Sequence, residues 1–190
     1  MAGKRLARAD WVRAAVTALA ERGVAAVAVE PLAARLGTTK GSFYWHFADR
    51  EALLAAALEN WEHEHTDDVV AALADITDPA QRLRSLLHGI FALGGDDLAV
   101  VLAGDTGHPL VRAALARVAE RRVAYVERAL ADLGLADAEA HRRAVVLYGA
   151  YIGYQQIHRT APELAPAGQA AAAFADSLLA LLPPTAGTPG

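Results

Sequence analysis

Residues 29–47, VEPLAARLGTTKGSFYWHF, decide the fold of this chain because they have the spacing of a helix-turn-helix motif. Leu32, Ala33 and Leu36 recur at the interval that predicts the inward face of a short first helix. Gly37 follows at once, in the position where a helix commonly ends in a left-handed residue. The stretch therefore predicts a helix, a tight turn and a second helix.

The second helix is expected over Lys40–Phe47, with Thr39 as its cap. Phe43 and Phe47 are four residues apart, so both are expected to face the core. The remaining positions are expected at the surface or its edge, and they are our candidate DNA contacts: Thr38, Thr39, Lys40, Gly41, Ser42, Tyr44, Trp45 and His46.

This surface is unusual for a solvated helix because it carries two large aromatic side chains and no acidic one. Its chemistry suits a phosphate backbone. Free N–H groups and the positive dipole end lie at the helix start, and the hydroxyls of Thr39 and Ser42 can bond phosphate oxygens. Lys40 adds positive charge, and Gly41 permits a close approach. The alternative is an ordinary two-helix corner that happens to expose aromatic residues.

Outside the motif, apolar periodicity and Gly/Pro breaks predict further helices and no strand, which makes the fold class all-α with about nine helices. A long helix is expected after its cap, Asp49, with Leu54, Leu58, Trp61, His65 and Val69 on one face. The other helices are expected over residues 9–22, from Asp78-Pro79 to Gly94, over 98–103, from His108-Pro109 to Gly134, from a cap at Asp137 to about 159, and over about 167–182.

Charge is divided unevenly along the 190 residues. Residues 1–50 hold eight Lys and Arg against four Asp and Glu, a net charge of +4, and the remainder carries −8. A basic segment followed by an acidic one suits a protein that presents one end to a polyanion. The chain has no cysteine, and we expect no transmembrane span, no signal peptide and a cytoplasmic location.

The helix-turn-helix and its flanks resemble the TetR family of regulators over roughly Ala9 to Trp61. The resemblance rests on Gly37-Thr38-Thr39-Lys40-Gly41-Ser42-Phe43-Tyr44, on the Trp45-His46-Phe47 that follows, and on Arg50-Glu51-X-Leu53-Leu54. It implies a homodimer on a palindromic double-stranded DNA operator, usually a repressor, and assigns a phosphate contact to Arg50. One departure is Ala28, where the family often has Ser or Thr as a helix cap.

The same resemblance implies that the last two long helices, about 138–159 and 167–182, pair with those of a second copy. Val146, Gly149, Gly153 and Gln156 form a stripe of mostly small residues that is our candidate dimer interface. A cavity for a small-molecule effector of lipophilic or aromatic character is the second expectation. Its candidate lining residues are Trp61, His65, Phe91, Tyr125, Tyr148, Tyr151 and Gln155. Plain core and interface packing is the alternative for each of them.

We expect three segments: a DNA-binding domain over 1–50, an effector-binding and dimerisation domain over 51–183, and a disordered tail over 184–190. The rival interpretations are a constitutive DNA-binding dimer without effector, a helical enzyme and an adaptor protein. The loop Gly104–His108 is the one candidate for a catalytic loop, but no nucleophile elbow, phosphate loop or dinucleotide motif accompanies it. We therefore expect no enzyme activity, no cofactor and no metal.

Overall fold

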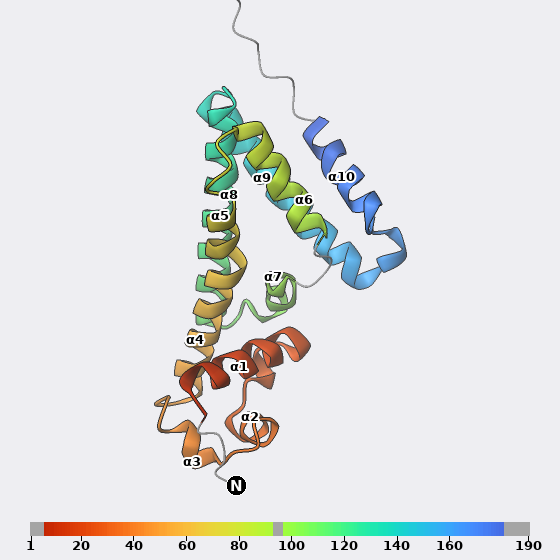
Figure 1. Cartoon of the computed structure of the whole chain (residues 1–190). Coiled ribbons are helices and arrows are strands. Elements are labelled where there is room, and N and C mark those ends of the chain that lie inside the picture. Colours follow the sequence, from red (N-terminus) through yellow and green to blue (C-terminus); the bar gives the residue numbers. More distant parts are fainter. Residues whose placement is uncertain (1–5, 93–96, 181–190) are drawn as a thin grey trace, which may run out of the picture. The chain divides into compact units, whose positions relative to one another are not determined.

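Helices make up the regular structure of residues 6–92 and 97–180, which are the parts of the chain that the computed structural model describes (Figure 1). No strand occurs in these two ranges, so the expected all-α class is confirmed. The elements are α1 (Arg8–Arg22), a 3-10 turn (Val24–Ala26), α2 (Val29–Arg35), α3 (Lys40–Phe43), α4 (Arg50–Glu62), a π-turn (His63–Asp67), α5 (Asp68–Ala72), α6 (Pro79–Ala92), α7 (Leu98–Leu102), a 3-10 turn (Ala103–Asp105), α8 (Pro109–Asp132), α9 (Asp137–Thr160), a 3-10 turn (Pro162–Leu164) and α10 (Gln169–Ala180). None of these helices is both long and apolar enough to cross a membrane.

The described residues group into two compact units. The first unit contains the chain up to His65 together with Leu98–Ala116, and the second contains Thr66–Asp97 and the chain from Arg117 onward. This grouping follows packing rather than the extent of the helix-turn-helix, so the expected boundary after residue 50 stays a prediction. The expected disordered tail, 184–190, lies outside the described residues.

A buried aromatic cluster holds the first unit together. The Trp11 ring of α1 meets Phe43 edge-on at 5.3 Å between centroids, and Phe47 stacks on Phe43 at 5.5 Å. All three rings are buried, so Phe43 and Phe47 face the core as predicted. Trp11 was not among the core positions that periodicity singled out, yet it lies at the centre of this cluster.

Backbone caps fix the connections around α3. Gly37 has φ +64°, and the N–H groups of Gly37 and Thr38 bond back to the carbonyls of Ala34 and Ala33 at 3.1 and 2.9 Å. These two bonds form a Schellman motif, which ends α2 and turns the chain. Thr39 then caps α3 by accepting a bond from the Ser42 N–H at 3.3 Å, as the sequence predicts.

The helix that begins at Arg50 continues to Ala72 through the π-turn. A π-turn accommodates one extra residue, so it shifts the buried face by one position. Trp61 and Glu62 are buried, the next buried position is Thr66, and His65 is exposed. The expectation that His65 shares the face of Trp61 is therefore wrong.

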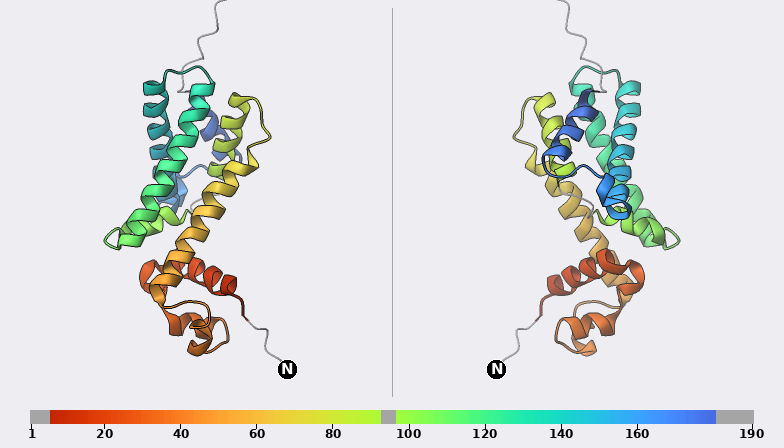
Figure 2. Two further views of the ribbon diagram at one scale, coloured as in Figure 1. Left: turned by 90° about the vertical axis from the view of Figure 1, so that its left-hand side faces the viewer. Right: turned by 90° about the vertical axis from the view of Figure 1, so that its right-hand side faces the viewer.

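The second unit has its own core, in which α6 packs against α9 and α10 (Figure 2). Phe91 contacts Tyr154 edge-on at 4.9 Å and Phe174 at 5.2 Å. The Tyr154 hydroxyl donates to the carbonyl of Phe91 at 3.0 Å or to that of Pro166 at 2.7 Å, so this buried phenol is satisfied.

Two predicted boundaries differ from the structure. The helix expected over Lys40–Phe47 is α-helical only to Phe43, and a turn with bonds from His46 and Phe47 to the Phe43 carbonyl completes it. Asp137 is the first residue of α9 and not its cap, because Ala136 takes the cap position. An acidic residue in the first turn still stabilises the helix through its dipole.

Candidate functional site

The predicted DNA contacts follow the Schellman turn and are carried by α3 and the turn after it. A shallow depression of the surface is lined by Leu6 and by Thr39, Gly41, Ser42, Trp45 and His46. Adding a Cβ to Gly41 would bring only an ordinary contact, 3.6 Å from the Thr39 hydroxyl, so the space beside this glycine is open. The structure thus gathers five of the predicted residues on one surface.

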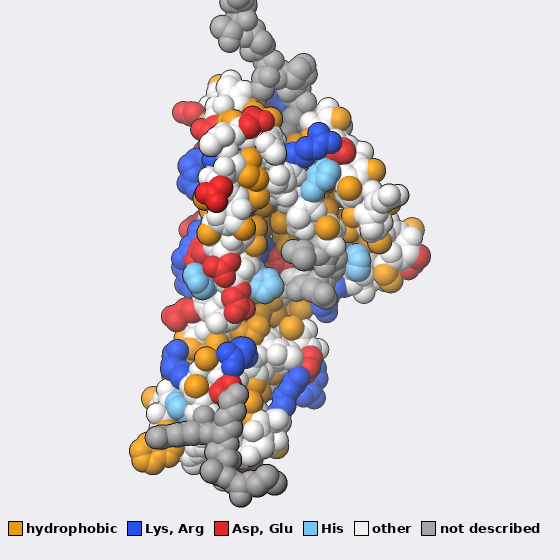
Figure 3. All heavy atoms as spheres, viewed as in Figure 1, with side chains coloured by type: hydrophobic (Ala, Val, Ile, Leu, Met, Phe, Trp, Pro, Cys, Tyr) orange, Lys and Arg blue, Asp and Glu red, His pale blue; other side chains and the backbone are white. Residues whose placement is uncertain are grey.

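Two aromatic side chains project from this surface. Tyr44 is 56% exposed and Trp45 is 86% exposed, although the adjoining Phe43 is fully buried. Tyr44 meets Phe43 edge-on at 5.1 Å, so one side of its ring packs on the buried Phe43 and the other side faces solvent. Figure 3 shows hydrophobic side chains reaching the surface over α3, with Lys and Arg side chains farther along the same unit.

Lys40 is tied to the preceding helix. Its Nζ donates to the Glu30 carboxylate at 3.0 Å, and both side chains are exposed. The hydrogen bond and the charge of Glu30 raise the pKa of Lys40, so the ammonium stays charged at neutral pH. A phosphate contact by Lys40 has to replace this carboxylate or share the ammonium with it.

Arg50 has three protein partners. Its Nε and Nη2 donate to the carbonyls of Val27 and Val24 at 2.6 and 2.7 Å, and its Nη1 pairs with Glu51 at 2.8 Å. The side chain thereby fixes the 3-10 turn between α1 and α2 to the start of α4. A guanidinium has five N–H donors, so two of them are available beyond these bonds. The phosphate contact that the family resemblance assigns to Arg50 stays a prediction, alongside a structural role that the sequence did not reveal.

The loop that sequence reasoning considered for catalysis holds the first unit together. The Asp105 carboxylate accepts a bond from the Val24 N–H at 2.9 Å, and His108 Nε2 lies 3.2 Å from the Glu51 carboxylate. Gly23 makes this approach possible, because a Cβ there would lie 2.5 Å from Asp105 Oδ2. Asp105 and His108 therefore have structural partners in the α1–α2 turn and at the start of α4.

This geometry agrees with a family match. A family model described as bacterial regulatory proteins of the tetR family matches residues 12–57, from α1 through the helix-turn-helix into α4. Residues 12–57 are thus similar to the tetR family of bacterial regulatory proteins. It includes every predicted DNA contact from Thr38 to Arg50, although it does not assign roles to individual residues.

Other proteins resemble the chain in sequence or in fold. The HTH-type transcriptional regulator TtgR of Pseudomonas putida is 36% identical over 86 residues, which are 44% of this chain and 40% of that protein. The chain thus aligns with less than half the length of this curated relative. The reduced form of NemR from E. coli superposes with a TM-score of 0.78 at 17% identity, covering 94% of this chain and 98% of that one. FadR from Bacillus subtilis in complex with stearoyl-CoA gives 0.69 at 16% identity, with coverage of 95% and 98%. At these identities the two solved structures show the fold alone.

The predicted effector residues are divided between the two units. Trp61 is a fully buried member of the first unit, whereas the other aromatic candidates belong to the second. Within the second unit, Phe91 and Tyr151 are in edge contact at 6.2 Å, and Gln155 lies close enough to Tyr151 to oppose the rise in the pKa of its hydroxyl. Tyr125 instead lines a separate pocket with Arg82.

A buried polar centre surrounds Tyr151. The Asp97 carboxylate accepts bonds from the Tyr151 hydroxyl at 2.7 Å and from Arg122, and the Arg122 Nε reaches the Thr66 hydroxyl at 3.2 Å. Burial and the Asp97 charge raise the pKa of Tyr151, so its phenol is a neutral donor. Burial also raises the pKa of Tyr148, which lies close enough to feel the Arg122 charge.

Sequence reasoning missed Asp97 and Arg122 in this centre. Arg122 belongs to an α8 stretch rich in Arg and Glu that has no sign of burial, and Asp97 follows an ordinary Gly-rich break. Gln155, which was a candidate, is only 1% exposed, and its side-chain carbonyl has no hydrogen-bond partner in the described structure. Such an unsatisfied acceptor is costly unless something donates to it.

The predicted dimer residues share one outward face of α9. Val146 is 68% exposed, Gly149 and Gln156 are exposed, and Gly153 has open space where a Cβ would lie. The exposed side chains of Val145 and Ile157 extend the same face. The face exposes apolar side chains beside two glycines with open space, and its role as an interface stays a prediction.

Proposed function

We propose that this protein is a transcriptional regulator that binds a palindromic operator as a homodimer, acts as a repressor and is released by a small-molecule effector. The observation that carries the proposal is the exposed pair Tyr44 and Trp45 beside Lys40 and Ser42, held by a buried Phe43. The family match over residues 12–57 and the regulator TtgR support the same function. FadR, another protein of this fold, was solved with stearoyl-CoA, which supports a lipophilic effector here.

DNA recognition would use both kinds of side chain on this surface. Lys40 and the hydroxyls of Thr39 and Ser42 are suited to phosphate oxygens, which position a protein without reading sequence. Tyr44 and Trp45 are suited to apolar contacts with base edges such as the thymine methyl group. In a symmetric dimer, two such surfaces about 34–36 Å apart would enter successive major grooves on one side of the duplex.

Dimerisation would use the outward face of α9. Gly149 and Gly153 let a partner helix approach closely, and Val145, Val146 and Ile157 supply apolar contacts around them. An isologous interface brings the same face of both copies together, so each contact that a side chain makes occurs twice, once from each copy.

The effector would act at the buried polar centre of the second unit. A ligand that donates a hydrogen bond to Gln155 and packs on Tyr151 would weaken the bond between the Tyr151 hydroxyl and the Asp97 carboxylate. Asp97 also holds Arg122, which bonds the Thr66 hydroxyl, so the change would reach Thr66. Thr66 belongs to the same unbroken helical run that begins with Arg50. A change in that run would alter the DNA-binding geometry and couple the two ligands negatively, typically by about 1–3 kcal/mol.

The test begins with selection of binding sites from a random duplex library. We expect an inverted repeat, bound by a dimer. In fluorescence anisotropy, Trp45→Ala should weaken binding to the selected operator by about tenfold or more, as losing a base contact does. Lys40→Ala should weaken binding to every sequence and lower the salt slope by about one unit. Arg84→Ala is the matched control, because it removes an exposed cation of the second unit that pairs with Asp176.

Three results would count against parts of the proposal. A library that yields no preferred sequence would refute operator recognition, and Trp45→Ala with full affinity would remove this surface from it. For the effector, acyl and aromatic compounds would be screened by thermal stabilisation and each hit titrated against the protein–operator complex. Compounds that bind the second unit yet leave operator affinity unchanged would favour a constitutive DNA-binding dimer.

A further inference from the structure

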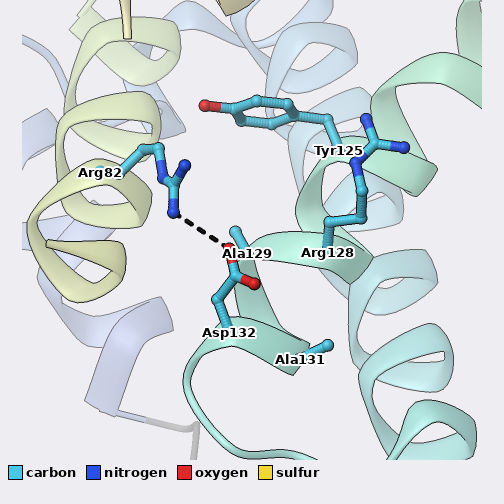
Figure 4. A pocket seen from close by; sticks show the side chains of 6 residues that line it. All are labelled: Arg82, Tyr125, Arg128, Ala129, Ala131 and Asp132. Atoms are coloured by element: carbon cyan, nitrogen blue, oxygen red, sulfur yellow. Dashed lines mark hydrogen bonds and ion pairs between the residues drawn. The ribbon is translucent and has the colours of Figure 1, made fainter. Parts of the chain in front are cut away.

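A second polar site lies in the unit that contains α6, between that helix and α8 (Figure 4). It is a pocket of about 260 Å³, below the size of typical pockets for drug-sized ligands. Its lining residues are Arg82, Tyr125, Arg128, Ala129, Ala131 and Asp132. A pocket this small suits a compact molecule rather than a long-chain or multi-ring one.

Two buried donors in this pocket have no protein acceptor. The Tyr125 hydroxyl and the Arg82 Nε are both inaccessible to solvent and have no hydrogen-bond partner in the described structure. In Figure 4 the Tyr125 hydroxyl points from α8 toward α6, on the side from which Arg82 projects. Burial raises the pKa of Tyr125 even though Arg82 and Arg128 oppose the shift, so the phenol keeps its proton and can donate. Unsatisfied buried donors of this kind favour a bound acceptor.

The charges of the pocket select the kind of acceptor. Arg82 and Arg128 contribute two positive charges, and Asp132 contributes one negative charge through its bond to Arg82 at 3.0 Å. Arg128 has no ion pair within the described parts of the chain. The net charge of +1 is balanced by a ligand with one negative charge, while a dianion would be repelled by Asp132. The planar guanidinium fork matches a carboxylate, and Ala129, Ala131 and the Tyr125 ring provide an apolar wall.

We propose that the pocket between α6 and α8 binds a small monocarboxylate, with its carboxylate held by Arg82 and the Tyr125 hydroxyl and attracted by the charge of Arg128, and its apolar part against Ala129 and Ala131. The site is distinct from the polar centre around Tyr151, and it does not depend on DNA binding. Its failure and the failure of the proposed function are therefore separate results.

The test uses the full chain without DNA and three probes. Benzoate is the monocarboxylate, benzamide is its neutral counterpart of nearly equal shape, and inorganic phosphate is the anion of higher charge. In calorimetric titration and thermal unfolding, we expect saturable benzoate binding that raises the melting temperature. Benzamide and phosphate should bind at least about tenfold more weakly, because the first lacks charge-assisted hydrogen bonds and the second faces Asp132.

Two variants locate the binding. Arg128→Gln removes a charge from an exposed side chain and should weaken benzoate about tenfold or more. Tyr125→Phe keeps the ring, removes a hydroxyl that has no protein partner and should weaken benzoate while leaving the unfolding temperature of the free protein unchanged or higher. The control Arg84→Gln changes another arginine of α6 that pairs with Asp176 outside the pocket, and it should leave benzoate affinity unchanged.

Three outcomes would overturn the proposal. These are no saturable benzoate binding, equal affinity for benzamide or phosphate, and unchanged benzoate affinity in both Arg128→Gln and Tyr125→Phe. Loss of benzoate binding in those two variants, with full binding in Arg84→Gln, would support it.

Discussion

Two surfaces of this protein expose large apolar side chains but have different neighbours. In the first unit, Tyr44 and Trp45 lie beside the hydroxyls of Thr39 and Ser42 and the ammonium of Lys40. In the second, Val145, Val146 and Ile157 lie along glycines and one glutamine of α9. The amount of exposed apolar area therefore does not identify the partner. Charge and hydroxyl groups around the aromatic pair suit DNA, while small residues between aliphatic ones suit another helix.

The largest expected effect tests whether the aromatic surface depends on the cluster beneath it. Phe43→Ala empties a fully buried site that contacts Trp11, Phe47 and Tyr44. We expect the free energy of unfolding to fall by about 3–5 kcal/mol in urea denaturation, as for other buried phenylalanines. Trp45→Ala is the control and should stay within about 0.5 kcal/mol of the unaltered protein. An equal loss of unfolding free energy in the two variants would show that the exposed Trp45 ring also stabilises the fold.

The next effect tests the aliphatic surface. Val146→Glu places a carboxylate on the α9 face, where two copies of it would be buried at a dimer interface. We expect dimer dissociation to become about 100-fold easier in light scattering and sedimentation, because an unpaired buried charge costs about 3 kcal/mol or more. Leu164→Glu alters another exposed apolar residue, 73% exposed, and should leave association unchanged. If both variants associate like the unaltered protein, the face of α9 is not the interface.

A smaller effect concerns the connection beneath the DNA-binding surface. Gly23 has φ +70° and ψ −166°, a conformation that is essentially restricted to glycine. Gly23→Ala also places a methyl group against Asp105, so we expect a loss of about 1–3 kcal/mol in thermal unfolding. Gly149→Ala is the contrast: it has open space on a helix and should stabilise the monomer by up to about 1 kcal/mol. A Gly23→Ala protein as stable as the unaltered one would show that the α1–α2 turn can relax.

The smallest effect concerns the cap of α2. Ala28 takes the cap position with an extended backbone and no side-chain bond, as its place in the sequence predicts. Ser at a cap typically contributes about 1 kcal/mol, but Pro31 has no N–H, so Ala28→Ser can reach only the Glu30 N–H. We therefore expect a gain near 0.5 kcal/mol in chemical denaturation, at the low end of the known range. A stability loss would mean that the hydroxyl is not free to accept this bond.

These positions also show what the sequence can predict. The Gly37 turn, the Thr39 cap and the inward Phe43 follow from interactions within a few residues, and the structure confirms all three. The exposure of His65 could not be predicted in this way, because the π-turn at His63–Asp67 changes register without any marked residue type.

Long-range polar partners were the least predictable part. Asp105 bonds Val24, which is 81 positions away in the chain, and Asp97 bonds Tyr151, 54 positions away. Neither aspartate differs in local sequence from an ordinary loop residue. Only the folded structure separates them from solvent-exposed acids and links them to the groups that they hold.

The ion pair between Lys40 and Glu30 has a consequence for the speed of searching along DNA. On non-specific duplex, a phosphate has to compete with a carboxylate that already holds the ammonium at 3.0 Å. Non-specific affinity comes almost wholly from such phosphate contacts, so an internal competitor shortens each stay at a wrong site. Glu30→Gln should then lengthen dwell times on random duplex in single-molecule tracking more than it prolongs the operator complex, and equal lengthening on both would contradict this role. Glu30 would thus favour rapid sampling of many sites over tight residence at any wrong one.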